Sequence, residues 1–387
     1  MNPPTTSRTR VLTALSHQPP DRVPMDLGGS MVSSIHVDAY TRLKDFLKLD
    51  LGETQSFARV SQLAAVDRVV LDRLGVDTCG VKPGTPENHP HRELPDEYGF
   101  VDEWGILRKM PPDADTYYVA NAPLAGDISI HDVLNYPMPD PTDPGYTNGL
   151  RDKILALRAA DQRAIVMSLP DSVVQQSQLL RGFGEWYTDA AANPALLCAL
   201  MDRVLEIQIA VWDTILSAVG DVVDVVFNFD DLAMQDRLIV SPAMYRKYLE
   251  PRVRKYIEWL KRKTSAKIVF HTDGAVAPVL ASLADMGVDG VNPLQVSAKG
   301  MGDVAALKKQ FGDRLAFWGG VDSQHTLPHG TPDAVRAETA SRIRDLNQNG
   351  GYVLGAVHNI QSDVPPENIV ALFETGLGRE LSNTKND

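Results

Sequence analysis

Short runs of apolar residues recur along the chain, and most are separated by stretches with apolar residues at helical spacing. Strands buried on both faces of a parallel sheet have this continuous apolar character. The runs lie at residues 23–27, 76–81, 164–169, 222–229, 268–270, 288–291, 315–321 and 351–357. The helical stretches lie at 148–160, 172–219, 242–263, 275–286, 304–311, 332–347 and 366–377. We therefore predict an α/β protein whose eight parallel strands close into a (β/α)8 TIM barrel.

A doubly wound open sheet is the alternative arrangement for alternating strands and helices. The sequence contains neither a G-x-G-x-x-G fingerprint nor a P-loop, which are the signatures that would support a nucleotide site on such a sheet. The barrel is therefore the favoured interpretation.

Two regions depart from the alternating pattern. Residues 37–47 and 55–74 carry apolar residues at helical spacing and predict two further helices. Residues 85–145 concentrate Pro, Asp and Tyr, with strand-like alternation at 99–110 that predicts a β-hairpin. So few periodic apolar positions could not bury a separate core. We interpret 85–145 as an insertion of hairpin and irregular chain near one barrel mouth, within a single domain spanning 1–387.

The charge and composition narrow the classes of partner. The net charge is −12 and the pI about 5.2, which argues against nucleic acid and anionic membrane surfaces. No apolar run has the length of about 18 residues expected of a transmembrane helix, and the first ten residues are polar. We therefore expect a cytoplasmic protein. Its two cysteines exclude a disulfide framework, a structural zinc knuckle and a thiolate-ligated iron–sulfur cluster.

Polar residues follow nearly every predicted strand, where the active sites of barrels lie. The run at 268–270 breaks into His271, Thr272, Asp273 and Gly274. In an extended segment the side chains at positions i and i+2 share one side, so His271 and Asp273 could bind one metal ion or one substrate group. The alternative is that both residues only cap the next helix. Their place among eight strand ends favours the metal site.

Further candidates follow the other strands. Asp230 and Asp231 end a deeply apolar run, and at least one of them should face the mouth, where burial raises a carboxyl pKa; the alternative is that Asp231 caps the following turn. His358 is a candidate acid, base or ligand after the last strand. We therefore predict Asp230, Asp231 and His358 as catalytic residues. The candidate substrate-binding residues are Asp26, His36, Gln235, Asn292, Asp322 and Gln361.

Several motifs together resemble one superfamily. In chain order they are D-R-V-P, F-D-D-L-A-M-Q, S-P-A-M-Y-R-K-Y-L-E-P, H-T-D-G, G-V-D-G-V-N-P-L-Q, W-G-G-V-D, H-N-I-Q and P-P-E-N-I. This series is similar to the superfamily of uroporphyrinogen decarboxylase and the cobalamin-linked methyltransferases, along nearly the whole chain. The resemblance implies a (β/α)8 barrel, in agreement with the strand pattern.

The sequence departs from the decarboxylase pattern at several points. The arginine-rich N-terminal motif that grips substrate carboxylates is replaced by M-D-L-G-G-S-M-V. The early strand that carries the decarboxylase's aspartate ends here at Lys82, and the active-site tyrosine falls among Gln175 and Gln176. His358 matches the functional histidine. A decarboxylase-like lyase acting on a small carboxylate, with His358 protonating a carbanion-like intermediate, is therefore kept as the alternative function.

The methyltransferases that load a thiol hold zinc through His-x-Cys and a later Cys, whereas this chain has His271 and Asp273. A site with nitrogen and oxygen ligands is a harder Lewis acid than a thiolate site. The resemblance therefore implies an enzyme of demethylase type that moves a methyl group from a small O- or N-methylated compound, assisted by zinc.

The expected methyl acceptor is tetrahydrofolate or the corrinoid of a separate carrier protein, because the chain lacks a D-x-H-x-x-G cobalamin signature. A homodimer is left open. A non-catalytic binding protein on the same barrel is the third interpretation.

Overall fold

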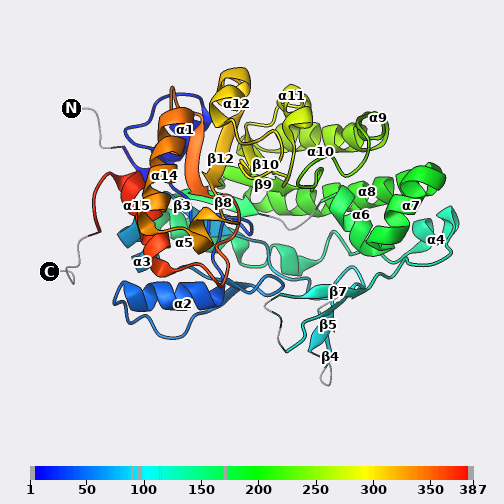
Figure 1. Ribbon diagram of the computed structural model, residues 1–387. Coiled ribbons are helices and arrows are strands. Elements are labelled where there is room, and N and C mark those ends of the chain that lie inside the picture. The colour runs from blue at the N-terminus through cyan, green and yellow to red at the C-terminus, as the bar shows by residue number, and fades with distance from the viewer. Residues whose placement is uncertain are drawn as a thin grey trace.

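The computed structural model describes residues 5–88, 91–94, 98–112, 114, 116–168 and 172–381. Seven parallel strands form its main sheet, in the order β13-β12-β11-β10-β9-β8-β3 (Figure 1). Their bounds are β3 (Thr78–Val81), β8 (Ala164–Ser168), β9 (Val225–Phe229), β10 (Lys267–His271), β11 (Gly290–Asn292), β12 (Ala316–Val321) and β13 (Tyr352–Ala356).

The first predicted strand, at residues 23–27, joins the two edges of this sheet. Met25 forms a parallel bridge with Leu354 of β13, and the Asp26 N–H donates to the Leu354 carbonyl at 2.9 Å. On the other side, the Asp77 N–H donates to the Met25 carbonyl at 2.8 Å, directly before β3. The eight apolar runs therefore form a ring, and the predicted TIM-barrel-like fold is confirmed.

The inside of the ring is a packed apolar core. Interior side chains of the strands include Val166, Phe227, Val269, Trp318 and Val353. The N-terminal end of the ring is covered by α1 (Ser7–Leu15), whose Val11 and Leu15 pack against these strands. The opposite end of the ring is the one where polar residues follow the strands.

Helices surround the ring and bury its outer face (Figure 1). Those of the regular units are α5 (Leu150–Ala160), α6 (Val174–Arg181), α7 (Phe183–Ala192), α8 (Pro194–Val219), α10 (Glu250–Lys263), α11 (Leu280–Asp285), α12 (Val304–Phe311), α14 (Pro332–Leu346) and α15 (Pro366–Leu377). Shorter pieces are η1 (Pro144–Tyr146), α9 (Pro242–Met244), η2 (Tyr245–Leu249), η3 (Ala277–Val279) and α13 (Thr326–His329). Within the described part of the chain, none of the helices combines the length and apolar character needed to cross a membrane.

The helices predicted near the N-terminus are only partly right. The first is α2 (Val37–Phe46), as predicted. The prediction of a helix at 55–74 is wrong in its first half, where β1 (Ser56–Ala58) pairs with β2 (Leu63–Ala64), and only α3 (Arg68–Leu74) is helical. Gln62 has a φ of 49°, in the left-handed region, so the chain turns back there instead of continuing a helix.

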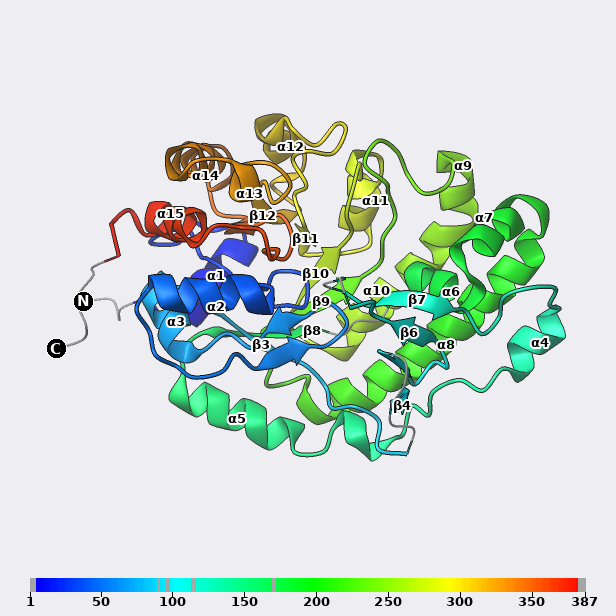
Figure 2. The same ribbon diagram turned by 60° about the horizontal axis from the view of Figure 1, so that its bottom comes forward.

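The region at 85–145 contains a small antiparallel sheet that projects below the barrel in Figure 1. Its strands are β4 (Arg92–Leu94), β5 (Gly99–Val101), β6 (Leu107–Lys109) and β7 (Tyr118–Asn121). The hairpin predicted at 99–110 is the pair β5–β6, so that prediction is confirmed. Figure 2 shows that the chain then runs on to α4 (Ile130–Asn135) at the far side of the molecule. The interpretation of this region as an insertion in a single domain stays a prediction.

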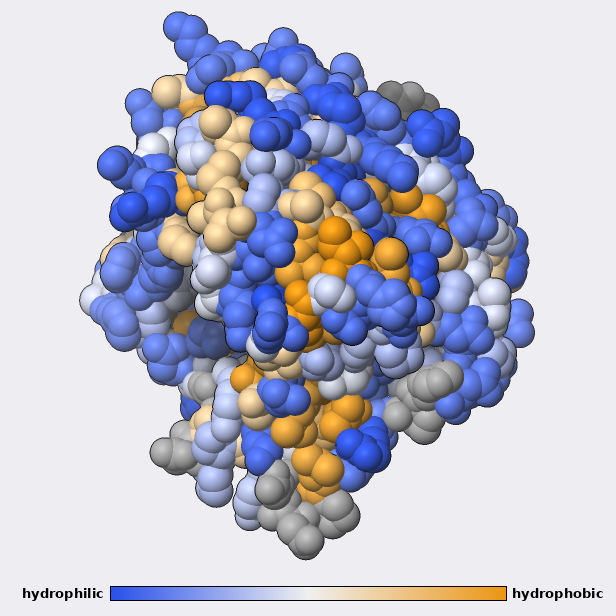
Figure 3. Space-filling view, turned by 90° about the vertical axis from the view of Figure 1, so that its right-hand side faces the viewer, coloured by the Kyte–Doolittle hydropathy of each residue, from blue (hydrophilic) through white to orange (hydrophobic). Residues whose placement is uncertain are grey.

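Figure 3 looks onto the side of the molecule that carries α4 and α7 in Figure 1, and apolar side chains gather there between hydrophilic ones. The exposed apolar residues on these two helices are Ile130, Leu134 and Phe183. The surface is therefore not uniformly polar, although the chain carries a net charge of −12.

Three carboxylates, two buried and one half-buried, tie the N-terminal rim of the barrel together. Asp77, Asp224 and Asp289 each directly follow a valine and lie one residue before β3, β9 and β11. Each accepts hydrogen bonds from basic side chains and from a backbone N–H; the donors are Arg10, Arg22 and Met25 for Asp77, Arg8, Arg158 and Ile165 for Asp224, and Lys261, Lys267 and Ile268 for Asp289. The N-terminal rim is thus held by ion pairs, which leaves the opposite rim for a site.

Candidate metal centre

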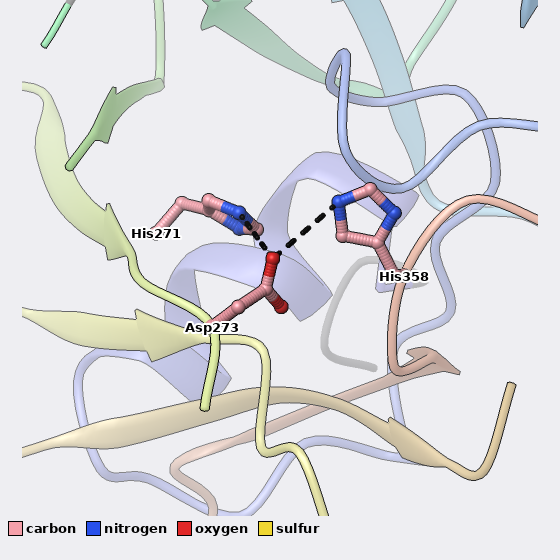
Figure 4. Close-up of side chains that lie close together, drawn as sticks. All are labelled: His271, Asp273 and His358. Atoms are coloured by element: carbon pink, nitrogen blue, oxygen red, sulfur yellow. Dashed lines mark ion pairs between the residues drawn. The ribbon is translucent and has the colours of Figure 1, made fainter. Parts of the chain in front are cut away.

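Three side chains that could bind a metal converge at the C-terminal rim of the barrel (Figure 4). His271 is the last residue of β10, Asp273 follows two residues later, and His358 lies two residues beyond β13. Asp273 Oδ2 is 3.4 Å from His271 Nε2 and 3.7 Å from His358 Nε2, and the ligand atoms of all three lie within 4.8 Å of one another. The predicted pair of His271 and Asp273 is therefore joined by His358, which was predicted as a catalytic residue.

These separations suit a divalent ion. Nitrogen and oxygen ligands about 2.0–2.2 Å from zinc, at tetrahedral angles, lie about 3.3–3.6 Å from one another. The two separations from the Asp273 carboxylate, 3.4 and 3.7 Å, are close to this value. The set of two imidazoles and one carboxylate also leaves a coordination position open, as catalytic zinc sites do.

A second carboxylate borders the cluster. Asp231 Oδ1 lies 4.0 Å from His271 Nε2 and accepts a hydrogen bond from the Asp273 N–H at 3.4 Å. Its other oxygen accepts from Gln175 Nε2 at 2.7 Å. Burial raises the pKa of Asp231 above the ordinary aspartate value. Asp231, predicted as a catalytic residue, is therefore the carboxyl of the Asp-Asp pair that faces the metal ligands.

The charges of the three candidate ligands depend on one another. Burial lowers the pKa of His271, but Asp273, Asp231 and Asn292 outweigh it, and the net result is a raised pKa. Burial raises the pKa of Asp273, but the two histidines outweigh it and bring it to about 2. Burial lowers the pKa of His358, so this imidazole loses its proton at a lower pH than an ordinary histidine. Among the described residues, His271 and His358 are the groups that lower the pKa of Asp273, whereas the neighbouring Asp231 is a like charge.

The neighbouring Asp230 points away from the candidate ligands, toward the start of α6. Its carboxylate accepts hydrogen bonds from the backbone N–H groups of Val173, Val174 and Gln175, at 3.0–3.2 Å, at the start of α6. Burial raises the pKa of Asp230 to about 7, against the opposing effect of these N–H groups. Asp230 therefore anchors the first turn of α6, and its predicted catalytic role stays a prediction.

Two of the predicted substrate-binding residues lie near the N-terminal segment. Asp26 is buried inside the barrel, where its carboxylate accepts from Trp318 Nε1 at 2.8 Å, from the Gly29 N–H at 3.0 Å and from the Thr78 hydroxyl. Burial raises the pKa of Asp26. His36 caps the N-terminus of α2, with Nδ1 accepting from the Asp38 N–H. Within the described chain, the hydrogen bonds of both residues join protein segments to one another, and substrate binding by either residue stays a prediction.

Asn292 contacts the cluster of candidate ligands directly, and Gln235 contacts its loop through Gln295. Gln235 Oε1 accepts from Gln295 Nε2 at 3.0 Å, and Gln295 Oε1 accepts from the Gly274 N–H at 2.6 Å. Asn292 Oδ1 accepts from His271 Nδ1 at 2.7 Å.

The remaining two candidates lie in other depressions of the same rim. Asp322 borders one of about 360 Å³ together with Glu338 and Arg342. Gln361 borders one of about 710 Å³ together with Ser323 and donates to the Asn359 carbonyl at 3.0 Å. Substrate binding by either residue stays a prediction.

Two neighbours of the cluster were not among the predicted site residues. Gln175 binds Asp231, and the ring of Phe229 lies 5.5 Å from that of His271. Gln175 lies in the first turn of the helix that follows a strand, and this position is a usable signal in a barrel. The sequence does not single out Phe229 as a site residue, because it lies in a mostly apolar strand whose residues are all buried.

Comparisons with known proteins agree with this description. The family "Uroporphyrinogen decarboxylase (URO-D)" matches residues 129–376, which is more than half of the chain. Among curated relatives, a uroporphyrinogen decarboxylase of Pelodictyon phaeoclathratiforme is 28% identical over 190 residues, covering 47% of this chain and 49% of the relative. The methylcobamide:CoM methyltransferase MtaA of Methanosarcina barkeri is 28% identical over 222 residues, covering 57% of this chain and 60% of the relative. The chain thus spans less than two thirds of the length of either relative.

Among solved structures, a methyltransferase from Methanosarcina mazei matches with a TM-score of 0.69 and 21% identity, over 97% of this chain and 99% of that one. At this identity the match shows the fold alone.

Proposed function

Because the chain belongs to the uroporphyrinogen decarboxylase family, we propose that it is a metal-assisted methyltransferase of that family. It would remove a methyl group from a small O- or N-methylated compound and pass it to a corrinoid protein or to a folate. The observation that carries the proposal is the cluster of His271, Asp273 and His358 at the catalytic rim of the barrel. The relative named as a methylcobamide:CoM methyltransferase supports the reaction class.

The donor atoms favour oxygen or nitrogen chemistry over sulfur chemistry. His271, His358 and Asp273 would hold zinc or a similar divalent ion through two nitrogens and one oxygen. Such an ion acts as a hard Lewis acid that polarises the oxygen or nitrogen of the methylated group. The two cysteines lie elsewhere, at Cys79 in β3 and Cys198 in α8, so the described cluster contains no thiolate that would favour a thiol substrate.

The protein's own groups can manage the proton of the reaction. When the methyl group leaves for the acceptor, the bond between methyl carbon and oxygen breaks and its electron pair stays on the oxygen. Asp231 lies 4.0 Å from His271 Nε2, and in its protonated form it would supply the proton that this oxygen takes up, while Gln175 holds the carboxyl in place. The ring of Phe229 keeps water from one side of His271.

The distribution of charge disfavours the alternative, decarboxylation of a small carboxylate. A carboxylate substrate at this rim would face the carboxyl groups of Asp231 and Asp273. The pKa of Asp273 is lowered to about 2, so its negative charge would oppose binding of such a substrate. Methyl transfer from a neutral or cationic compound fits these charges better, with His358 as a ligand instead of a proton donor.

The test combines metal analysis with a methyl-transfer assay. The purified protein should contain about one divalent ion per chain, and a panel of O- and N-methylated compounds should include one that yields methylcobalamin or methyltetrahydrofolate. His271→Ala should lose both the metal and the activity, whereas the matched control His329→Ala, which alters an exposed histidine on α13, should keep both. Absence of metal after loading, or no methylated product with any acceptor, would refute the proposal.

A further inference from the structure

We infer that Asn292 is a positioning residue that fixes the tautomer of His271, so that the Nε2 lone pair of this imidazole points into the metal cluster. The inference rests on the proposed metal site, which it extends by one residue behind the ligands. It gives Asn292 a different role from the substrate contact that its place after a strand suggests.

The backbone places Asn292 where it can act only on His271 and its own sheet. Asn292 is the last residue of β11 and lies directly opposite His271 in the parallel register of β10 and β11. Its side chain is fully buried. A group with no access to the mouth cannot contact substrate, but it can orient a ligand.

The hydrogen bonds of Asn292 leave one orientation for its amide. Oδ1 lies 2.7 Å from His271 Nδ1, and Nδ2 donates to the Trp318 carbonyl at 3.4 Å. Rotating the amide by half a turn would set its oxygen against the Trp318 carbonyl, where two acceptors would meet. Trp318 is itself anchored, because its indole N–H donates to the buried Asp26 at 2.8 Å. The acceptor end of Asn292 is therefore held toward the imidazole.

This orientation decides the tautomer of the imidazole. An amide oxygen can only accept, so the hydrogen of a neutral His271 must lie on Nδ1. Nε2 then carries a lone pair and faces Asp273 Oδ2 at 3.4 Å and Asp231 Oδ1 at 4.0 Å. In the metal-free protein a second proton on Nε2 can face these carboxylate oxygens, and a bound metal ion would take the place of that proton. A histidine that binds metal through one nitrogen and donates through the other is the common arrangement in metal sites.

A second residue of the same segment holds the loop of the other ligand. Gln295, three residues after Asn292, accepts from the Gly274 N–H at 2.6 Å, directly beside Asp273. Asn292 and Gln295 are the polar residues of the sequence N-P-L-Q. The end of β11 and the residues after it thus contact both His271 and the loop that carries Asp273.

Two variants of Asn292 separate the role in orientation from a role in packing. Asn292→Leu removes the acceptor at similar size, and Asn292→Asp keeps an acceptor toward Nδ1. Asn368→Leu is the matched control, because Asn368 on α15 is equally buried and donates to the carbonyls of Leu327 and Gly330. Zinc affinity is measured by competition with a chelator and cobalt binding by visible absorption. The His271 tautomer is read by 15N NMR of histidine-labelled, metal-free protein at alkaline pH, with His271→Ala to assign the signal.

We expect Nδ1–H on His271 in the unaltered protein. In Asn292→Leu we expect loss of that tautomer preference and a 10- to 100-fold weaker zinc affinity, whereas Asn292→Asp and Asn368→Leu stay within a few-fold. Unchanged tautomer and unchanged affinity in Asn292→Leu would overturn the inference, as would Nε2–H in the unaltered protein. If the unaltered protein binds no metal, the proposed function fails, while the tautomer of the metal-free protein still decides the role of Asn292.

Discussion

The ion pairs around Asp77 offer a direct test of how the barrel is closed. The buried carboxylate of Asp77 accepts from Arg10 at 2.6 Å, from Arg22 at 2.7 Å and from the Met25 N–H at 2.9 Å. Met25 is the residue that bridges to Leu354 of β13 and so joins the edges of the sheet. Asp77→Ala removes all these bonds at once and leaves a buried guanidinium and a backbone N–H without this acceptor.

The expected loss of stability can be estimated. Removing one partner of a buried ion pair costs about 3–5 kcal/mol. Taking about 2.1 cal/mol/K per residue over 387 residues, the entropy of unfolding is about 0.8 kcal/mol/K. Dividing the free-energy loss by this entropy gives a fall in melting temperature of about 4–6 °C. The free-energy loss itself is large compared with a typical total stability of about 5–15 kcal/mol.

Thermal unfolding followed by circular dichroism measures this fall. Asp313→Ala is the matched control, because Asp313 is an exposed aspartate of the same end of the barrel, one turn before β12. Its melting temperature should change by less than about 1 °C. A fall of less than about 1 °C in Asp77→Ala as well would refute the reasoning, since it would mean that Arg10 is fully served by Asp21, its other partner at 2.7 Å.

Two further predictions concern the ligand loop and the small sheet. Gly274 has a φ of +93°, and a Cβ there would lie 2.4 Å from the Met234 carbonyl oxygen. Gly274→Ala should therefore weaken cobalt binding more than 10-fold in a titration followed by visible absorption, and equal binding would contradict this prediction. The control is Gly126→Ala, where φ is +85° but no atom lies within 4 Å of the added Cβ. The hydrogen bond that His91 donates to the Glu103 carboxylate raises the pKa of His91 above its ordinary value. The pair therefore stabilises the fold below about pH 6.5 and loses its effect as the pH rises through the raised pKa. The melting temperature of His91→Gln should therefore differ from that of the unaltered protein more at pH 5.5 than at pH 8.5, and an equal difference at both would count against this pairing.

The sequence allowed the strands and the ligand pair to be predicted because both are local signals. A continuous apolar run followed by His271 and Asp273 needs no knowledge of distant residues. The contribution of His358 to the same cluster depends on closure of the ring, which brings β13 within reach of β10 across the barrel mouth. Its participation could be expected only after the barrel itself was assumed.

Other features could not be predicted for identifiable physical reasons. Asp230 and Asp231 point to opposite sides of their strand, and an apolar run buried on both faces does not reveal which parity faces inward. In the structure Phe227 and Phe229 point into the barrel, so Asp231 continues on that side and Asp230 does not. The outer strands β4 and β7 were missed because each has only three or four residues and is stabilised by pairing with its neighbours in the small sheet.

The pairing of residues 25–36 with the end of β13 and the residues after it affects the order in which the barrel can fold during synthesis. The amide of Asn359, next to His358, donates to the Met31 carbonyl and accepts from the Ser34 N–H. Met25 forms its parallel bridge with Leu354. These contacts of residues 25–36 therefore form only after the segment at residues 354–359 has been made. Until then, His271 and Asp273 lack His358, the third residue of the cluster. The proposed metal ion would therefore bind only after this last part of the barrel has folded.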